Sequence, residues 1–454
     1  MKTLEVIAKD EIFTISDDET MDIKYLNKYI AKHQQLNGSR YKKLKDGYEG
    51  FYPIMMYQDK PQYKPDNRII VNFAKYIVDT FNGFFIGIPI KVSSTDEEVA
   101  TYINELDKRN HQDDNNAEIS KNCSIYGKCY EMYFINEDAK VGIRYIEPTK
   151  GFIVYDDSIV PEPRFFVTYY YDSNSIMHGY LSDDSYVYEF SNKSGMHFVD
   201  EGSLHGFDGV PVTEYVENAE RMSAFESTWS MINAYNKAIS EKANDVDYFA
   251  DAYLKIIGAK VDKDGIVHIR NNRIINFDEE SNTVDVGFLE KPNADGSQEN
   301  LINRLERLIF QMSMTPNIND ENFGTSSGIA LKYKLLSMSN LAKTKERKFT
   351  GALDRRYKLI FSNPINTIHE DKWVDVTYKF SQNYPANVLE ETQIAQNLEG
   401  VVSKDTQLSS LSIVEDVQEE KEKINHRPDG TAPAVPFFSV RAPRTGRRYF
   451  SNKA

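Results

Sequence analysis

The most suggestive chemical motif in this 454-residue chain runs from Gly324 to Gly328 and reads G-x-S-x-G around Ser326. This is the pattern of the nucleophile elbow in α/β-hydrolases, where a strand leads directly into the serine. The preceding residues, INDENF, lack the alternation of a strand, and no alternating order of strands and helices surrounds the motif. His369 is therefore not expected to act as its base. We interpret Ser326 or Ser327 as the N-cap of the following helix, and a hydrolase using Ser326 stays a minor alternative.

Paired carboxylates are the second kind of candidate, because two close acids can bind a metal ion or divide the roles of acid and base. Two such pairs are Asp113 with Asp114 and Asp245 with Asp247. The chain has 69 acidic residues, so acidic neighbours are frequent and are mostly solvated. A nuclease built on either pair is a minor alternative. We predict no catalytic site and no metal site.

Cofactor motifs are missing from the sequence. It contains neither the G-x-x-x-x-G-K-[ST] phosphate loop nor the H-E-x-x-H zinc motif. Its two cysteines, Cys123 and Cys129, are six residues apart, which fits neither zinc nor redox spacing. We expect two reduced, partly buried thiols and no cofactor.

The segment between Gly328 and Ile360 is positively charged, although the whole chain has a net charge of -15. It contains nine Lys or Arg and two acidic residues. Apolar residues recur there mostly in steps of three, four or seven, which predicts one long helix with a buried stripe and outward-facing cations. The rest of the chain, without this segment and the last thirty residues, has 39 basic and 66 acidic residues. Because this acidic part repels DNA, contact with DNA has to be confined to small patches. The nominated cations are Lys332, Lys334, Lys343, Lys345, Arg347 and Lys348.

The first half of the chain predicts helices followed by a sheet. Helical patterning covers 22–36 and 41–48, and a third helix is expected between an N-cap at Asn67 and Gly83. FFIGIPIKV then reads as a strand, and its apolar run is far shorter than the roughly 20 residues that span a bilayer, so we expect no membrane segment. A further helix over 96–109 precedes the polar stretch HQDDNNAEISKN. Alternating aromatic and β-branched runs over 130–216 predict an antiparallel meander.

Two helices with narrow apolar seams are predicted in the second half. Apolar residues between Phe225 and Ala250 step by three or four, which predicts a helix of about 36 Å. Ser297 is expected to cap the second helix, and the strand-like pieces between the two predict a small α/β module. The second seam consists of Leu301, Leu305, Leu308 and Met312. The two helices could pack side by side, and since neither has another obvious partner in the chain, they can bury their second face against copies of the same chain.

The order of these segments resembles the portal, or head-to-tail connector, proteins of tailed double-stranded-DNA bacteriophages. The resemblance covers roughly 22–424, and its most specific stretches are RYKKLKDGYEG, NRIIVNFAKYIVDTFNGFFIGIPI, SSGIALKYKLLSMSNLAKTKERKFTGALDRRYKLI and LEETQIAQNLEGVVSKDTQLSSL. It implies a multidomain α+β portal fold. The implied parts are a wing (1–220, with a return strand at 363–385), two stem helices (221–250 and 298–313), a clip (251–297), a tunnel loop (314–327), a long basic helix (328–362), helical crown segments (386–424) and a flexible basic tail (425–454).

The resemblance also implies a function and a set of partners. Family members form rings, usually of twelve copies, at one capsid vertex, and double-stranded DNA passes through the centre. The implied partners are the terminase large subunit, a head–tail adaptor, and the major capsid and scaffolding proteins, with assembly in the host cytoplasm. The tunnel-loop residues nominated to face DNA are Asn317, Asn319, Asn322 and Phe323. We expect reversing Lys343 and Lys345 to glutamate to impair packaging or ring assembly without harming folding, and a monomeric nucleic-acid-binding protein is the main alternative.

Overall fold

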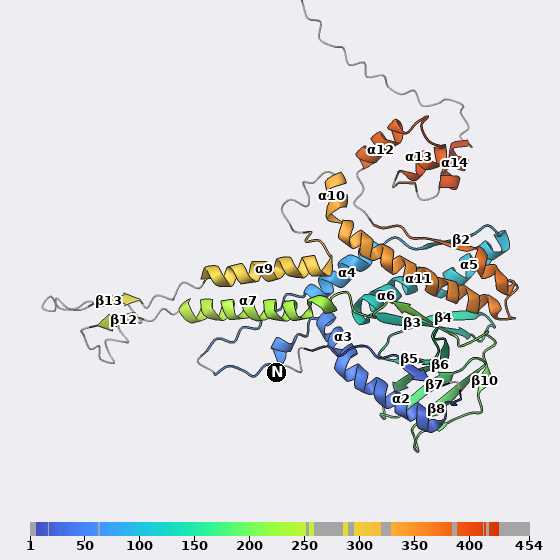
Figure 1. The fold of residues 1–454 in the computed structure, drawn as a ribbon, viewed down its shortest axis with the longest axis horizontal. Coiled ribbons are helices and arrows are strands. Elements are labelled where there is room, and N and C mark those ends of the chain that lie inside the picture. The colour runs from blue at the N-terminus through green and yellow to red at the C-terminus, as the bar shows by residue number, and fades with distance from the viewer. Residues whose placement is uncertain are drawn as a thin grey trace, which may run out of the picture. The chain divides into compact units, whose positions relative to one another are not determined.

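The structure is a computed structural model that describes residues 6–16, 18–61, 64–250, 254–257, 285–288, 295–318, 328–383, 388–411, 413–414 and 417–425. The chain divides into two compact units, residues 1–384 and 385–454. The ribbon is shown in Figure 1. Helices and strands both occur, so the predicted α+β class is confirmed.

The first two predicted helices are confirmed and join end to end. Helix α2 (Ile23–Leu36) begins at Asp22, whose side chain accepts a hydrogen bond from the amide of Tyr25. It continues through a π-helical turn, η1 (Asn37–Tyr41), into α3 (Lys42–Glu49). Gly50 ends α3 with a φ of 93°, the left-handed conformation that glycine adopts without strain.

The third helix differs at both ends from the prediction. Helix α4 (Phe73–Ile86) is capped by Asn72 and not by Asn67, and it passes through Gly83 to end at Ile86. A short 3-10 helix, η2 (Pro53–Met56), precedes it. Most of FFIGIPIKV is therefore helix or turn, and the strand β2 begins only at Lys91 (Lys91–Ser94). The strand was predicted too early in the sequence, because the apolar residues of a buried helix end cannot be told from those of a buried strand.

The polar stretch after the next helix is itself a buried helix. The helix predicted over 96–109 is confirmed as α5 (Glu97–Asn110), and Asp96 caps it. Helix α6 (Gln112–Tyr126) follows at once and buries ten of its fifteen residues. Among these are the polar residues Gln112, Asn115, Asn116, Ser120, Asn122 and Ser124.

The predicted antiparallel meander is confirmed. Its strands are β3 (Lys128–Ile135), β4 (Val141–Ile146), β5 (Gly151–Asp156), β6 (Pro163–Tyr171), β7 (Met177–Ser182), β8 (Tyr186–Ser191), β9 (His197–Phe198), β10 (Ser203–Leu204) and β11 (Val212–Val216). One sheet has the order β1-β5-β6-β7-β8-β10, with β9 on β8, and β1 (Phe13–Ile15) joins it in parallel. A smaller sheet has the order β11-β3-β4. Side chains of α2 pack on the larger sheet in one hydrophobic cluster.

The two seam helices exist and lie side by side (Figure 1). Helix α7 (Trp229–Ala250) follows a 3-10 turn, η3 (Glu226–Thr228), and helix α9 spans Asp295–Ser313. Because α9 begins at Asp295, Ser297 lies inside the helix and is not its cap. Of the strands predicted between them, β12 (Leu254–Ile257) and β13 (Asp285–Phe288) are described and pair in antiparallel fashion.

The predicted long basic helix is two helices. Helix α10 (Gly328–Lys334) meets α11 (Leu336–Ser362) at Leu335, and Figure 1 shows them at an angle to each other. Helical hydrogen bonding continues through this kink, since the amide of Leu335 donates to the carbonyl of Leu331 at 3.0 Å. Helix α11 packs on α4 and α6 along one part of its length and on α5, β3 and β4 along another. After it come η4 (Glu370–Asp375) and the predicted return strand β14 (Val376–Lys379), which pairs with β2.

In the second unit, the residues that the structure describes form three short helices. These are α12 (Val388–Asn397), α13 (Lys404–Ser409) and α14 (Val417–Asn425), and Ser403 caps α13. Helices were predicted over 386–424. The tail at 426–454 lies outside the described residues.

Candidate functional site

The nominated cations divide into exposed side chains and one buried side chain. Lys332, Lys334, Lys343, Arg347 and Lys348 are exposed on α10 and α11, as the sequence predicts. Lys345 is only 1% exposed, so the prediction that it faces outward is wrong.

Lys345 forms a buried ion pair inside the subunit. Its ammonium lies 2.6 Å from Oε2 of Glu217 and donates to the carbonyl of Ser120 at 3.0 Å and to Oγ of Ser124 at 2.9 Å. The same ammonium lies 5.1 Å from the ring centre of Phe85. These contacts tie α11 to α6 and to the residue after β11, so Lys345 holds elements together and is not available to DNA.

Arg356 is a second buried cation on the same helix. It and Glu131 are both fully buried, and two nitrogens of its guanidinium donate to the two carboxylate oxygens at 2.8 and 2.9 Å. Asn116 accepts a further bond at 2.7 Å, and the hydroxyls of Tyr133 and Tyr215 donate to Glu131 at 2.9 and 3.0 Å. This network of buried hydrogen bonds fixes α11 on β3 and α6. The sequence did not predict this pair, although position 356 falls on the apolar stripe between Leu353 and Ile360.

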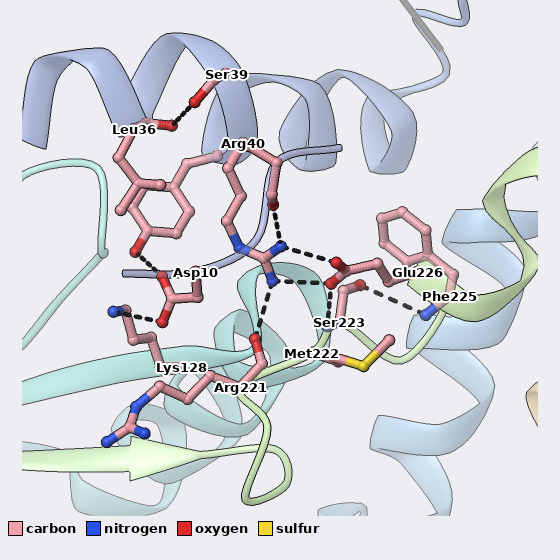
Figure 2. A network of polar contacts seen from close by, with 12 residues as sticks. Asp10, Leu36, Ser39, Arg40, Lys128, Arg221, Met222, Ser223, Phe225 and Glu226 are labelled. Carbon is pink, nitrogen blue, oxygen red and sulfur yellow. Dashed lines mark hydrogen bonds and ion pairs between the residues drawn. The ribbon is translucent and has the colours of Figure 1, made fainter. Parts of the chain in front are cut away.

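A polar junction clamps the root of α7 to the N-terminal helices (Figure 2). Arg40, in the π-helical turn, donates from both terminal nitrogens to Glu226 at 2.8 Å each. It also donates to the carbonyls of Ala8 and Arg221 at 2.8 and 2.9 Å, and its side chain is 1% exposed. A bidentate pair has a fixed geometry, so three distant segments of the chain meet here in one arrangement.

Beside this clamp, Asp10 accepts hydrogen bonds from two further elements. The hydroxyl of Tyr41 donates to one carboxylate oxygen and the ammonium of Lys128 to the other, both at 2.8 Å (Figure 2). Lys128 and Asp10 are both 6% exposed. The N-terminal segment is therefore bonded to both the helices and β3.

Helix α7 also carries a ladder of polar side chains that holds the extended segment 67–71 along it. Every second backbone amide of that segment donates a hydrogen bond to every fourth side chain of the helix. The spacing of these amides matches the spacing of the side chains, because two extended residues rise about 6.7 Å and four helical residues about 6 Å. The three bonds join Asn67 to Asn244 at 2.6 Å, Ile69 to Ser240 at 2.9 Å and Val71 to Asn236 at 2.9 Å.

The two apolar seams are buried to different extents. The first half of the α7 seam is buried within the subunit, with Phe225 and Ile232 fully covered by the cluster around α3 and α4. The expectation that it lacks a partner in the chain is wrong there. On α9, Ile302 and Ile309 face that cluster, whereas Leu301 is 51% exposed.

Of the nominated tunnel-loop residues, only Asn317 lies in the described part of the chain. Its amide donates to Glu306 of α9 at 3.4 Å. The hydroxyl of Tyr76, on α4, donates to the carbonyl of Pro316 at 3.0 Å and accepts from the amide of Ile318 at 3.2 Å. The connection is thus fixed to α4 as far as residue 318. Asn319, Asn322, Phe323 and the candidate nucleophile Ser326 lie outside the described residues.

The acidic pairs are not assembled into a catalytic or metal site. Asp245 accepts a hydrogen bond from Gln298 at 2.9 Å and Asp247 one from Asn67 at 2.5 Å, so both join neighbouring elements. Asp113 and Asp114 are exposed at the start of α6. Among the described residues, no three His, Cys, Asp or Glu side chains are grouped so that they could hold a metal ion.

A pocket beside that helix start contains a carboxyl of altered acidity. It is lined by Asp107, Gln112, Lys91 and Lys108 among others. Burial raises the pKa of Asp107 to about 6, against the opposing effect of the positive charge of Arg356. The residues that line this pocket include no Ser, Thr or Cys whose hydroxyl or thiol such a carboxyl could activate.

Both cysteines are free and completely buried, more so than the sequence predicts. Burial raises the pKa of the Cys123 and Cys129 thiols well above the ordinary value, which leaves them protonated and unreactive. None of the described helices combines the length and the apolar character needed to cross a bilayer.

Comparison with known proteins gives matches along most of the chain. The model of the family "Phage portal protein, SPP1 Gp6-like" matches residues 27–433. The portal protein of Bacillus phage SPP1 is 23% identical over 461 residues, covering 92% of this chain and 88% of that protein. The portal protein of Clostridium phage phiCD119 is 22% identical over 395 residues, covering 80% and 85%. A chain from the neck of an empty GTA particle, computed with C6 symmetry, covers 81% of this chain and 92% of its own length at 10% identity and a TM-score of 0.45.

Proposed function

Because this chain belongs to the SPP1 Gp6-like family of phage portal proteins, we propose that copies of it close into a ring around a channel for double-stranded DNA. The chain is a portal protein and thus a component of the virion. Its role is structural, and catalysis is left to other proteins. Ring closure requires two different surfaces of each copy to fit each other.

The observation that carries the ring is an uncovered apolar flank on α9. Leu301 is 51% exposed, and Met312 and Met314, near and just beyond the end of the helix, are each 47% exposed. They lie beside the face of α9 that packs on α7 and α4, yet nothing in the described residues covers them. Exposed apolar side chains grouped along one helix mark a surface for association, and a neighbouring copy supplies the missing cover.

We assign the parts of the ring from the family relationship together with the elements described. The wing is 1–220 with 363–385, the stem 221–250 and 298–313, the clip 251–297, the tunnel loop 314–327, the basic helix 328–362, the crown 386–424 and the tail 425–454. In this arrangement α7 and α9 line the channel. The tunnel loop, with Asn317, Asn319, Asn322 and Phe323, faces the DNA, and the exposed cations of α10 and α11 stand behind it.

The partners in this proposal follow the sequence of assembly. The clip docks the terminase large subunit during packaging, and head–tail adaptor proteins afterwards. The wing and crown contact major capsid and scaffolding proteins, and assembly takes place in the host cytoplasm. Twelve copies per ring is the expected number.

Electron microscopy and mass measurement of the purified chain test the proposal. We expect annular particles and a mass of many copies. The double variant Leu301→Asp with Met312→Asp is expected to lower that mass, because it places carboxylates where a neighbour packs. Ile159→Asp with Val160→Asp makes the same chemical change at side chains that are 100% and 72% exposed in a sheet connection, and it should keep the ring. A mass of one copy for the unaltered chain at every concentration would refute the proposal.

A further inference from the structure

Five polar side chains form a ridge along α9, on the side opposite the face that packs within the subunit. All five are exposed, and their steps of one, three and four residues place them on one side of the helix. Ile302 and Ile309, on the other side, are buried. From its first to its last member the ridge is about 16 Å long. The ridge residues are Asn300, Asn303, Arg304, Arg307 and Gln311.

The chemistry of the ridge is that of hydrogen-bond donors. It contains only amides and guanidiniums and no carboxylate, in a chain with 69 acidic residues. Arg304 and Arg307 form no hydrogen bond and no ion pair with any residue that the structure describes. Buried arginines such as Arg40 and Arg356 are, by contrast, held by carboxylates inside the subunit. The two ridge guanidiniums also line an open groove, together with Leu308.

We infer that this ridge is the surface of the subunit that contacts the phosphates of DNA in the channel, an inference that rests on the ring proposed above. Guanidinium groups bind phosphate oxygens in a bidentate manner, and side-chain amides donate to phosphates without reading the base sequence. A ridge of this composition therefore suits a cargo of any sequence.

The apolar flank of the same helix supports this orientation. Leu301 and Met312 lie beside the ridge, roughly a third of a turn around α9 from its centre. When a second copy covers the flank, the ridge next to it stays open, and a closed ring repeats it in every subunit. The stem helix then has three faces: one for its own subunit, one for the neighbour and one for the cargo.

The ridge has only two positive charges per subunit, which suits DNA that has to move through the channel. Each phosphate that a cation neutralises adds affinity that falls with salt, with a slope near 0.9 in log units. Two guanidiniums per subunit, separated by neutral amides, guide the duplex with little resistance to sliding. A continuous row of lysines would hold the DNA in place.

The test uses the assembled full-length protein and a random-sequence duplex of about 30 base pairs, with affinity measured at several salt concentrations. The variant is Arg304→Gln with Arg307→Gln, which keeps the amide character of the ridge. The matched control, Lys140→Gln with Arg144→Gln, removes two charges from exposed positions around β4. For each copy that contacts the duplex, we expect the ridge variant to lose about two units of salt slope. Raising salt from about 50 to 200 mM should then cost it about tenfold less affinity than the unaltered protein.

The control is expected to keep the original slope. A ridge variant that stays a ring with an unchanged slope would overturn the inference and leave the ring proposal standing. A ridge variant that falls to smaller species would overturn it differently, by showing that Arg304 and Arg307 bind acidic groups of a neighbouring copy. If the unaltered protein never forms a ring, the proposed function itself fails.

Discussion

Lys343 and Lys345 are two residues apart on α11, and the structure predicts opposite results for the same substitution at each. Lys343 is exposed, whereas Lys345 is 1% exposed and paired with Glu217 at 2.6 Å. Lys345→Glu removes the cation, leaves Ser120 and Ser124 without their donor, and places two carboxylates side by side in the core. The sequence alone predicted that reversing both lysines leaves folding intact.

The expected magnitude follows from the burial of the pair. Breaking a buried ion pair by removing one partner costs about 3 to 5 kcal/mol, and a second negative charge at the same place adds to that. A domain has only about 5 to 15 kcal/mol of stability in total, so Lys345→Glu should abolish or nearly abolish folding of the first unit. Lys343→Glu should change the free energy of unfolding by no more than about 0.5 kcal/mol.

Urea unfolding at one fixed protein concentration measures both variants, because assembly also contributes to apparent stability. Lys345→Met keeps the packing volume but isolates the charge of Glu217, and should cost about 3 to 5 kcal/mol. Adding Glu217→Gln removes that charge and should recover most of the loss, since the two residues act as one unit. Equal urea midpoints for Lys345→Glu and Lys343→Glu would refute the buried pair. So would a double variant no more stable than Lys345→Met.

Three further predictions follow from single contacts. Asn236→Leu should cost about 1 to 3 kcal/mol and speed hydrogen exchange at the amide of Val71, which loses its acceptor; unchanged exchange would contradict the ladder on α7. Burial raises the pKa of Asp107 to about 6, so its contribution to stability is complete below pH 4 and is lost as pH rises through 6. Asp107→Asn should therefore gain roughly 3 kcal/mol over the unaltered chain between pH 4 and 7, and a pH-independent difference would show that the carboxyl is solvated. Gly127→Ala should destabilise by at least about 2 kcal/mol, because φ is 91° and the new Cβ would lie 1.9 Å from the carbonyl oxygen of Arg221; a neutral result would mean that this turn relaxes freely.

The regular alternation and spacing of apolar residues predicted much of the fold. The meander, α2, α3, α5 and the pair α7 and α9 were predicted because each repeats its apolar residues at the period of a strand or a helix. Caps were harder to place. Asn67 and Asn72 are equally good N-cap residues, and only the backbone course selects Asn72. Asn67 instead joins the ladder on α7, which is a contact between segments far apart in the sequence.

The candidate site was predictable only where charge and exposure coincide. The excess of basic residues predicted the helical segment of α10 and α11, but it does not distinguish buried lysines from exposed ones. The apolar stripe of α11 runs from Met338 through Ala342 to Phe349, and the seven-residue gap between the last two contains Lys345 at the position that completes steps of four, three and four. A cation in the register of a buried stripe indicates a buried pair. The sequence does not reveal the partner, because Glu217 lies more than a hundred residues away.

Helix α6 shows why polarity alone misled the prediction at the centre of the subunit. Its residues look like a solvated connection, yet Gln112, Asn116 and Ser124 are buried because they supply the hydrogen bonds that the cations of α11 and their carboxylates require. Such a lining stabilises the two ion pairs, because hydrogen bonds to a buried charge offset the loss of its hydration. The acidic body and the basic helix are thus connected inside the subunit, through Glu131 with Arg356 and through Glu217 with Lys345. Arg304 and Arg307 on α9 form no such pair with any residue that the structure describes, so their charge is available to a polyanion outside the subunit.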